Sequence, residues 1–360
     1  MQVGVAPRAG ARVDQAGEQR LARLESLRAL AALGVLVGHV WGARHAFGAT
    51  GTDDLLERTI FGGGYGVFVF FALSGYLLFR PLANAVFDGE RVDLRSYAIN
   101  RLLRTLPLYY VVVFVLLVVQ EGGGTFGQWW RFATLTENLF PSTVLTVDGP
   151  IWSLLVELQF YALLPLVAVA LAWLARGSRR NAAILLLVAG VAGAALRIYL
   201  LNHRHVGDPR IVYSLLTTAF FFVPGMLLAL ARDVRLRGPL GSGDLWLLAS
   251  IPVWLFIFDD YSRTAWAAVA SFLVVGGAAL PLRHGPLVRA LDWRPLAVVG
   301  IASYSLYLWH LPIVNAMQRH GALLWAVPVS LLVALVSYRV VEAPFLRLRR
   351  RWSSSSYSAR

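Results

Sequence analysis

Apolar residues recur along the chain in long runs, and short polar segments separate the runs. Most runs are about 18 to 22 residues long, which at 1.5 Å per helical residue spans a bilayer core of roughly 30 Å. The pattern predicts an all-α fold, a bundle of about ten transmembrane helices whose ends are placed to within about four residues. The predicted spans are 26–46, 60–79, 102–120, 151–174, 181–201, 211–231, 244–258, 264–281, 296–318 and 322–342.

Composition supports insertion into a membrane. Of the 360 residues, 58% are hydrophobic and 15% are charged, whereas a soluble globular chain is about half apolar and about a quarter charged. The net charge of +13 would also suit a nucleic-acid partner, but the arginines lie between the apolar spans and form no single basic domain. We therefore expect the lipid bilayer to be a partner of this polytopic integral membrane protein, and nucleic acid not to be one.

The arginines also predict an orientation. With sides alternating at each span, one side carries roughly three times as many arginines outside the spans as the other. Positive charge collects on the cytoplasmic side of membrane proteins, so both termini are predicted to be cytoplasmic. An odd number of spans would remove this bias, so the charge count and the helix count support each other.

The two ends of the chain are polar. Residues 1–22 are predicted to form a disordered cytoplasmic tail without the apolar core of a signal peptide, and 347–360 a basic flexible cytoplasmic tail. The transmembrane domain lies between them, at 23–346. We expect a multi-pass protein of a bacterial plasma membrane, and the use of arginine alone, with abundant Ala, Gly, Leu and Val, indicates GC-rich coding and an actinobacterial source.

Few ionisable residues fall inside the predicted spans, and each is costly there unless it faces protein or water. Arg28 and His39 are eleven positions apart in the first span, so they share one helix face at about 16 Å from each other. Counted from the predicted span ends, His39, Glu157 and His310 all lie at a depth of roughly 20 Å. The sequence therefore predicts that three helices bring these groups to one level.

A histidine with a carboxylate is what a general-base mechanism requires, since the imidazole takes a proton and the carboxylate orients the ring. The alternative is a buried polar network that only fixes helix packing, with Glu157 neutralised by burial or paired. A transporter or flippase would also place charges at this depth. The absence of Cys and Lys excludes an acyl-cysteine or a lysine Schiff base.

Six sequence blocks resemble, in order, the acyltransferase-3 family of membrane O-acyltransferases. The first is LRALAALGVLVGH, which holds Arg28, ten further residues and His39. The others are GVFVFFALSGYLL at 66–78, RLLRTLPLYY at 101–110, WSLLVELQFY at 152–161, GIASYSLYLWHLP at 300–312 and VEAPF at 341–345. The resemblance covers about residues 23 to 346 and implies a ten-helix acyltransferase with both ends in the cytoplasm.

The resemblance implies transfer of an acyl group, often acetyl from acetyl-CoA, to a hydroxyl of a sugar or glycosylated compound. It makes His39, Glu157 and Arg28 the catalytic candidates, with His39 as general base or acyl carrier. Arg101 and Arg104 match the paired-arginine motif, and arginine suits the phosphates of a cytoplasmic acyl-CoA. Their alternative role is that of ordinary positive-inside anchors. No metal is expected.

The remaining candidates are expected to bind the acyl donor or the hydroxyl-bearing acceptor. Ser74 is expected beside the donor or in a close helix contact. The expected acceptor-binding residues are Trp152, Tyr161, Tyr304, His310 and Arg197. Arg197 could instead reach the interface, or pair with Glu157 or with an acceptor carboxylate. Glu342 at the end of the last span could pair with a nearby arginine and is expected to be structural. Some family members carry a C-terminal hydrolase-like domain that has no counterpart in this sequence, which favours a small or lipid-linked acceptor. Acceptor identity, acyl length and oligomeric state stay open.

Overall fold

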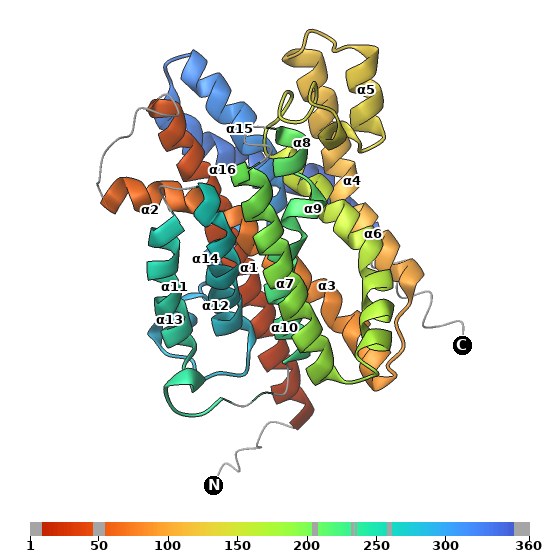
Figure 1. The fold of residues 1–360 in the computed structure, drawn as a ribbon. Coiled ribbons are helices and arrows are strands. Elements are labelled where there is room, and N and C mark those ends of the chain that lie inside the picture. Colours follow the sequence, from red (N-terminus) through yellow and green to blue (C-terminus); the bar gives the residue numbers. More distant parts are fainter. Residues whose placement is uncertain are drawn as a thin grey trace.

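The computed structural model describes residues 9–45, 55–203, 208–231, 234, 236–257 and 261–348. Within these ranges the fold is all-α and contains no β-strand, apart from one isolated bridge between Ser242 and Arg283. Figure 1 shows the helices running mostly along one direction. The predicted fold class is therefore confirmed as helical.

Six helical segments of the described chain are long and apolar enough to cross a membrane: Gln19–Arg44, Gly62–Asp88, Leu94–Val119, Ile151–Leu174, Arg179–Leu201 and Leu323–Leu348. The pair Arg294–Ile301 and Ser303–Arg319, bent by 70°, can make a seventh, and shorter apolar helices cover Leu215–Leu230, Gly243–Ile257 and Arg263–Ala279. Every predicted span overlaps one of these segments. The structure is thus that of a polytopic membrane protein, whereas ten complete crossings and the side of each terminus stay predictions.

The elements follow one another along the chain without long gaps between them. The helices of the N-terminal half are α1 (Ala9–Arg44), α2 (Leu55–Gly64), α3 (Gly66–Asp88), α4 (Leu94–Val119), α5 (Phe126–Ala133), η1 (Glu137–Leu139), α6 (Ile151–Leu174) and α7 (Arg179–His203). Those of the C-terminal half are α8 (Pro209–Val212), α9 (Leu215–Thr218), η2 (Ala219–Phe222), α10 (Val223–Leu230), η3 (Gly238–Gly241), α11 (Gly243–Ile257), η4 (Tyr261–Trp266), α12 (Ala267–Ala279), α13 (Pro286–Ala290), α14 (Arg294–Ile301), α15 (Ser303–Arg319), η5 (Leu323–Trp325), α16 (Ala326–Ser337) and η6 (Tyr338–Glu342).

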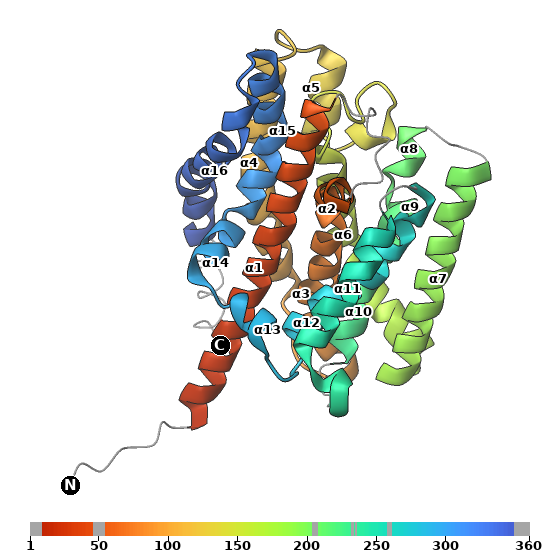
Figure 2. The same ribbon diagram turned by 90° about the vertical axis from the view of Figure 1, so that its left-hand side faces the viewer.

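Helix α1 lies in the middle of the bundle. It packs against α2, α3, α12, α14, α15 and α16. Figure 2 shows α14, α15 and α16 on one side of α1 and α2, α3 and α12 on the other. A residue on α1 can therefore face either group of helices, depending on its position around the helix axis.

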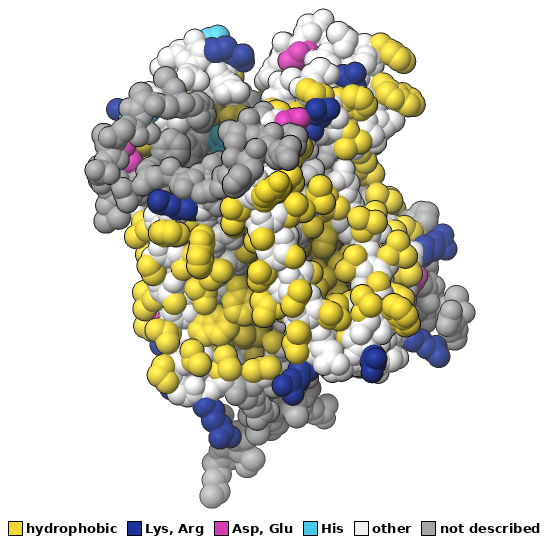
Figure 3. Space-filling view, viewed as in Figure 1, with side chains coloured by type: hydrophobic (Ala, Val, Ile, Leu, Met, Phe, Trp, Pro, Cys, Tyr) yellow, Lys and Arg dark blue, Asp and Glu magenta, His cyan; other side chains and the backbone are white. Residues whose placement is uncertain are grey.

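The central helices of the bundle are more deeply buried than the peripheral ones. In α3, 72% of the apolar span is buried, whereas in α7 the share is 17%. Large apolar side chains such as Leu166 and Trp173 point outward at 67% and 79% exposure. Figure 3 shows apolar side chains across the middle of one face and arginines toward its upper and lower edges. This distribution suits contact with lipid, which does not compete for hydrogen bonds.

Two glycines allow α3 and α10 to pack closely. A Cβ atom added at Gly225 would lie 1.8 Å from the carbonyl oxygen of Ala72, and one added at Gly75 would lie 2.2 Å from that of Phe222. Small residues at such crossings let helix backbones approach within the membrane. The contact fixes the rotation of α3 and so the direction of the neighbouring Ser74.

The ends of the chain differ from the prediction where they can be compared. Helix α1 begins at Ala9, so the segment predicted as a disordered tail is helical from that residue onward. Residues 347 and 348 are helical as well. Residues 1–8 and 349–360, which make up the rest of the two predicted tails, lie outside the described residues.

Glu137 is a buried carboxylic acid in η1, outside the long apolar helices. It is 2% exposed, and the Tyr109 hydroxyl donates to its Oε1 atom at 3.5 Å. Burial raises the pKa of Glu137 from 4.5 to about 8. The folded protein therefore keeps this proton at pH values where the unfolded chain has already released it. Between these two pKa values the free energy of unfolding should fall as the pH rises.

We expect Glu137→Gln to remove this pH dependence. The free energy of unfolding of the variant, compared with that of the wild type, should rise with pH and be highest from about pH 8 upward. The difference should be on the order of a few kcal/mol, because one pKa unit corresponds to about 1.4 kcal/mol. Thermal unfolding of the purified protein in detergent between about pH 5 and pH 9 measures the effect. The exposed Glu121 is the matched control, and Glu121→Gln should follow the wild-type curve. A Glu137→Gln curve parallel to that of the wild type would contradict the prediction.

Candidate active site

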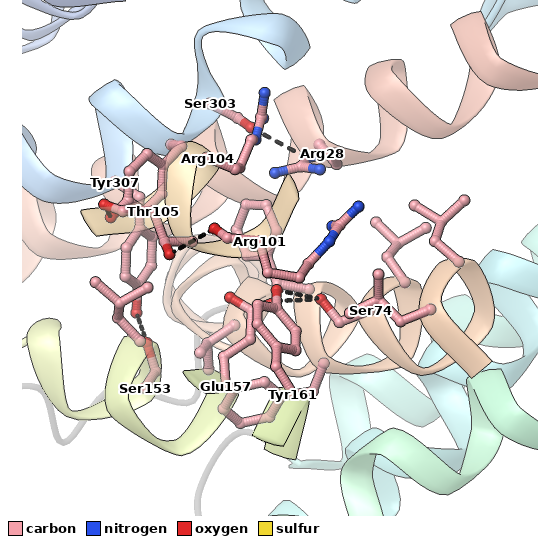
Figure 4. Close-up of a pocket in the computed structure, with 18 residues that line it drawn as sticks. Arg28, Ser74, Arg101, Arg104, Thr105, Ser153, Glu157, Tyr161, Ser303 and Tyr307 are labelled. Carbon is pink, nitrogen blue, oxygen red and sulfur yellow. Dashed lines mark hydrogen bonds between the residues drawn. The ribbon is translucent and has the colours of Figure 1, made fainter. Parts of the chain in front are cut away.

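The first cavity of the site is lined by three arginines, Arg28 from α1 and Arg101 and Arg104 from α4. We call it the arginine cavity. Its accessible volume is about 70 Å³, and α3, α6 and α15 complete its walls. Figure 4 shows the three side chains on one side of the cavity, with the guanidinium group of Arg28 between those of Arg101 and Arg104. Arg101 and Arg104 share the cavity because residues three apart in a helix lie on one face.

Some N–H groups of these arginines have no hydrogen-bond partner within the described chain. Arg28 Nε donates to Ser303 Oγ at 3.3 Å and lies 3.7 Å from Glu25 Oε2. Arg101 Nε and Arg104 Nη2 are buried and have no hydrogen-bond partner within the described chain. A buried N–H group without a partner costs free energy. These donors are therefore available to an anion that enters the cavity, and guanidinium groups bind phosphate and carboxylate in a bidentate way.

Glu157 and Ser74 form the opposite wall of the arginine cavity. The Ser74 hydroxyl donates to Glu157 Oε1, and it lies 3.5 Å from the Tyr161 hydroxyl (Figure 4). The Arg101 guanidinium carbon lies 6.0 Å from the centre of the Tyr161 ring. Ser74 therefore lines the cavity beside the close helix contact at Gly75, and its role in donor binding stays a prediction.

A second cavity is lined by His39, and we call it the histidine cavity. Its accessible volume is about 260 Å³, and its aromatic walls are Tyr65, Phe68, Trp152, Tyr213 and Tyr307. The rings of Trp152 and Tyr213 lie 4.7 Å apart, centre to centre. Cavities with apolar and aromatic walls and a few polar groups are typical of small-molecule sites.

The imidazole of His39 is oriented by its own helix. Its Nδ1 atom lies 2.8 Å from the carbonyl oxygen of Val35. A carbonyl only accepts hydrogen bonds, so Nδ1 carries the proton and Nε2 of the neutral ring carries the lone pair. His310 is held in the same way by the carbonyl of Tyr307 at 2.6 Å. The two rings meet edge to face, with centres 4.9 Å apart.

The two cavities meet at Tyr307 and Val67, which line both. The Tyr307 hydroxyl lies 2.7 Å from Ser153 Oγ, and its ring packs edge to face on Phe70 at 5.7 Å. Arg28 and His39, which share one face of α1, line the arginine and the histidine cavity respectively. An extended ligand anchored by the arginines therefore has to pass Tyr307 to reach His39.

The predicted convergence of three groups is only partly seen. His39 and His310 do meet, but Glu157 lines the arginine cavity and bonds to Ser74. Within the described chain no hydrogen bond joins Glu157 to His39, and the partner that orients His39 is the carbonyl of Val35. The rotation of α6 about its axis points Glu157 toward Ser74 of α3. The predicted orienting role of Glu157 is therefore corrected.

The expected acceptor residues are divided between the two cavities. Trp152 lines the histidine cavity, whereas Tyr161 and Tyr304 line the arginine cavity. The Tyr304 hydroxyl donates to the carbonyl of Thr105 at 2.7 Å, which ties α15 to α4 beside Arg104. These three aromatic residues are thus part of the cavity walls, as expected, but they do not form one acceptor pocket.

Arg197 lies apart from both cavities. It is 2% exposed, and its Nη1 donates to the carbonyls of Val212 at 3.1 Å and Thr217 at 3.3 Å. Its guanidinium carbon lies 5.6 Å from the centre of the Phe221 ring. Neither predicted position, at the membrane interface or paired with Glu157, is observed. Arg197 instead satisfies backbone carbonyls of the irregular segment 208–222.

Sequence reasoning missed two residues of the site. Tyr307 lines both cavities, and its position three residues before His310 on one helix was a signal for it. Ser303 holds Arg28, and no sequence pattern distinguishes it from a packing serine. No group of three or more His, Asp or Glu side chains that could hold a metal ion occurs within the described residues.

Comparison with known proteins places the chain in a protein family. The family model Acyl_transf_3, described as an acyltransferase domain, matches residues 21–340. The chain is 26% identical over 367 residues to YrhL of Bacillus subtilis, which is named provisionally as a peptidoglycan O-acetyltransferase. It is 26% identical over 363 residues to the O-acetyltransferase OatA of Staphylococcus aureus.

These alignments cover 89% of the chain but only 54% of YrhL and 56% of OatA, so the chain spans about half the length of these relatives. No solved structure matches the chain. The organisms of the relatives support a bacterial membrane protein but lend no support to an actinobacterial source. The family match covers most of the chain, and the protein therefore belongs to the acyltransferase-3 family.

Proposed function

We propose that this protein is a membrane O-acyltransferase that moves an acyl group from an acyl-CoA to a hydroxyl of a carbohydrate or glycoside. One observation carries the proposal: a cavity with three arginines and a cavity with a basic histidine nitrogen share the walls Tyr307 and Val67. Acyl-CoA has phosphates at one end and a reactive thioester at the other. The two cavities offer a partner to each end.

The proposed binding of the acyl donor rests on the positive charge of three arginines. Arg28, Arg101 and Arg104 would bind the phosphates, with the unpartnered Arg101 Nε and Arg104 Nη2 as donors. Arg28 precedes His39 on α1, so with the N-terminus in the cytoplasm the arginines lie nearer the cytoplasmic face, where acyl-CoA is made. The pantetheine arm would then extend past Tyr307 toward His39.

The chemical step uses His39. Its Nε2 lone pair takes the proton of the acceptor hydroxyl while the hydroxyl oxygen attacks the thioester carbonyl carbon. The carbon–sulfur bond breaks as the ester forms, and the departing thiolate of coenzyme A receives the proton from the His39 imidazolium. Burial of His310 beside His39 excludes water from one side of the ring. The carbonyl of Val35 keeps the ring in the tautomer that this step needs.

The acceptor is a carbohydrate in this proposal because the two named relatives are O-acetyltransferases, one of them assigned by name to peptidoglycan. The aromatic walls of the histidine cavity, including Trp152, suit the apolar face of a sugar ring. Tyr161, Tyr304 and His310 contribute to the site as wall or packing residues, and Arg197 has no direct role.

The test is incubation of the purified protein with acetyl-CoA and with longer acyl-CoAs, together with lipid and glycan extracts of the source cells. We expect release of coenzyme A and an acylated glycan or glycolipid in the mass spectra of the extracts. Protein with both Arg101→Gln and Arg104→Gln is the matched negative control. If the folded wild type consumes no acyl-CoA with any extract yet moves a solute across vesicles, the protein is a transporter and the proposal is wrong.

A further inference from the structure

Glu342 is a buried carboxylate that lines neither cavity. It is 2% exposed, and its Oε1 accepts a hydrogen bond from the Ser305 hydroxyl. Its Oε2 is also buried and has no hydrogen-bond partner within the described chain. An unpartnered carboxylate oxygen in a helical bundle is costly, and a nearby positive charge offsets part of that cost.

The local backbone aims Glu342 inward. Residues Tyr338–Glu342 form a π-helical turn at the end of α16. In a regular α-helix, Glu342 would lie about 80° away from the buried face that carries Ala334, because eight residues come to roughly 800°. A π turn inserts one extra residue and brings Glu342 back to within about 20° of that face. Such turns are frequent at functional sites.

Three consecutive residues of α15 connect Glu342 to the arginine cavity. Ser303 accepts from Arg28, Tyr304 donates to the carbonyl of Thr105, and Ser305 donates to Glu342. The η6 turn packs directly against α4, the helix of Arg104. Short contacts therefore hold α1, α4 and the end of α16 around one segment.

Arg104 is the arginine whose charge acts most strongly on Glu342. The charges of Arg104 and Arg28 both act on Glu342, and that of Glu342 acts on Arg104. No hydrogen bond joins Glu342 to Arg104 in the described residues, and Arg104 Nη2 stays without a partner. Glu342 can thus attract the guanidinium without occupying the N–H groups that face the cavity.

We propose that Glu342 is a positioning residue, whose buried carboxylate holds Arg104 in the orientation that binds the phosphates of the acyl donor. The proposal rests on the proposed function, since it assumes an anionic donor in the arginine cavity. It assigns the VEAPF segment a role beyond helix termination. Ser305 is the residue that keeps the carboxylate in place.

The experiment compares Glu342→Gln, Arg104→Gln and the double variant. Gln keeps the shape of the side chain and can still accept from Ser305, so only the charge is lost. We expect Glu342→Gln to weaken coenzyme A binding roughly tenfold, the worth of one charge-assisted hydrogen bond. In the Arg104→Gln background the same change should have no further effect. Glu342→Asp, which restores the charge, should recover part of the binding.

Calorimetry with coenzyme A and thermal unfolding of each variant in detergent give two separate readings. Unchanged or tighter binding in Glu342→Gln would overturn the positioning role, since removal of a negative charge alone favours an anion. Additive losses of thermal stability in the double variant would show that the two side chains do not act on each other, which also overturns it. If the wild type binds no coenzyme A while the stability losses are non-additive, the pairing holds and the proposed donor is what fails.

Discussion

Replacing His39 by alanine is expected to lower acyl transfer by roughly 10²- to 10⁴-fold, the usual contribution of a general base. The reason is that Nε2 of His39 is the basic atom in the histidine cavity, held in place by the Val35 carbonyl. Binding of coenzyme A should stay close to that of the wild type, because the proposed phosphate site is in the other cavity. The measurement is the initial rate of coenzyme A release, together with calorimetry on the same protein.

His45 provides a matched control for this variant. Its Nδ1 lies 3.0 Å from the carbonyl of Trp41, four residues earlier, which repeats the arrangement at His39. His45 lines neither cavity. We expect His45→Ala to keep its activity. Folded His39→Ala with wild-type rates would refute the assignment of the base, and an added acyl mass on the wild type without acceptor would make His39 an acyl carrier instead.

Replacing Arg104 by glutamine is expected to weaken coenzyme A binding by about 10- to 100-fold, because charge-assisted hydrogen bonds to phosphate contribute roughly 1.5–3 kcal/mol. Arg104→Lys should recover little of the binding, since lysine keeps the charge but lacks the planar fork. The measurement is calorimetry with coenzyme A at low and high salt.

Arg180 is the control for charge alone. It is an exposed arginine at the start of α7, away from the arginine cavity. Its replacement by glutamine changes the net charge of the protein equally and should leave coenzyme A binding unchanged. Equal effects of Arg104→Gln and Arg180→Gln would mean that overall charge, and not the cavity, attracts the donor.

Periodicity and spacing predicted much of the site. Arg101 and Arg104 are three residues apart on one apolar helix, and they do share a cavity. Arg28 and His39 lie on one face of α1 at a separation of about 16 Å, and they line the two neighbouring cavities. These relations depend on the geometry of a single helix, which the sequence alone specifies.

Relations between helices were predicted less well. The depth of Glu157 says nothing about the direction in which it points around the axis of α6, and the structure turns it to Ser74. The partners of Arg197 are backbone carbonyls of an irregular segment. A pattern of side chains does not predict such partners. The π turn that aims Glu342 inward is a local departure from the period on which the prediction relied.

The sequence by itself determined that the protein is helical and apolar, which ionisable groups its helices carry and how far apart they lie along each helix. It did so because the 3.6-residue period and the cost of placing charge in lipid act locally. The tertiary structure decided which groups meet across helices. Each helix rotation is set by contacts such as that between Gly225 and Ala72, where two backbones touch. The packing of the helices points Glu157 to Ser74 and leaves Tyr307 between the two cavities.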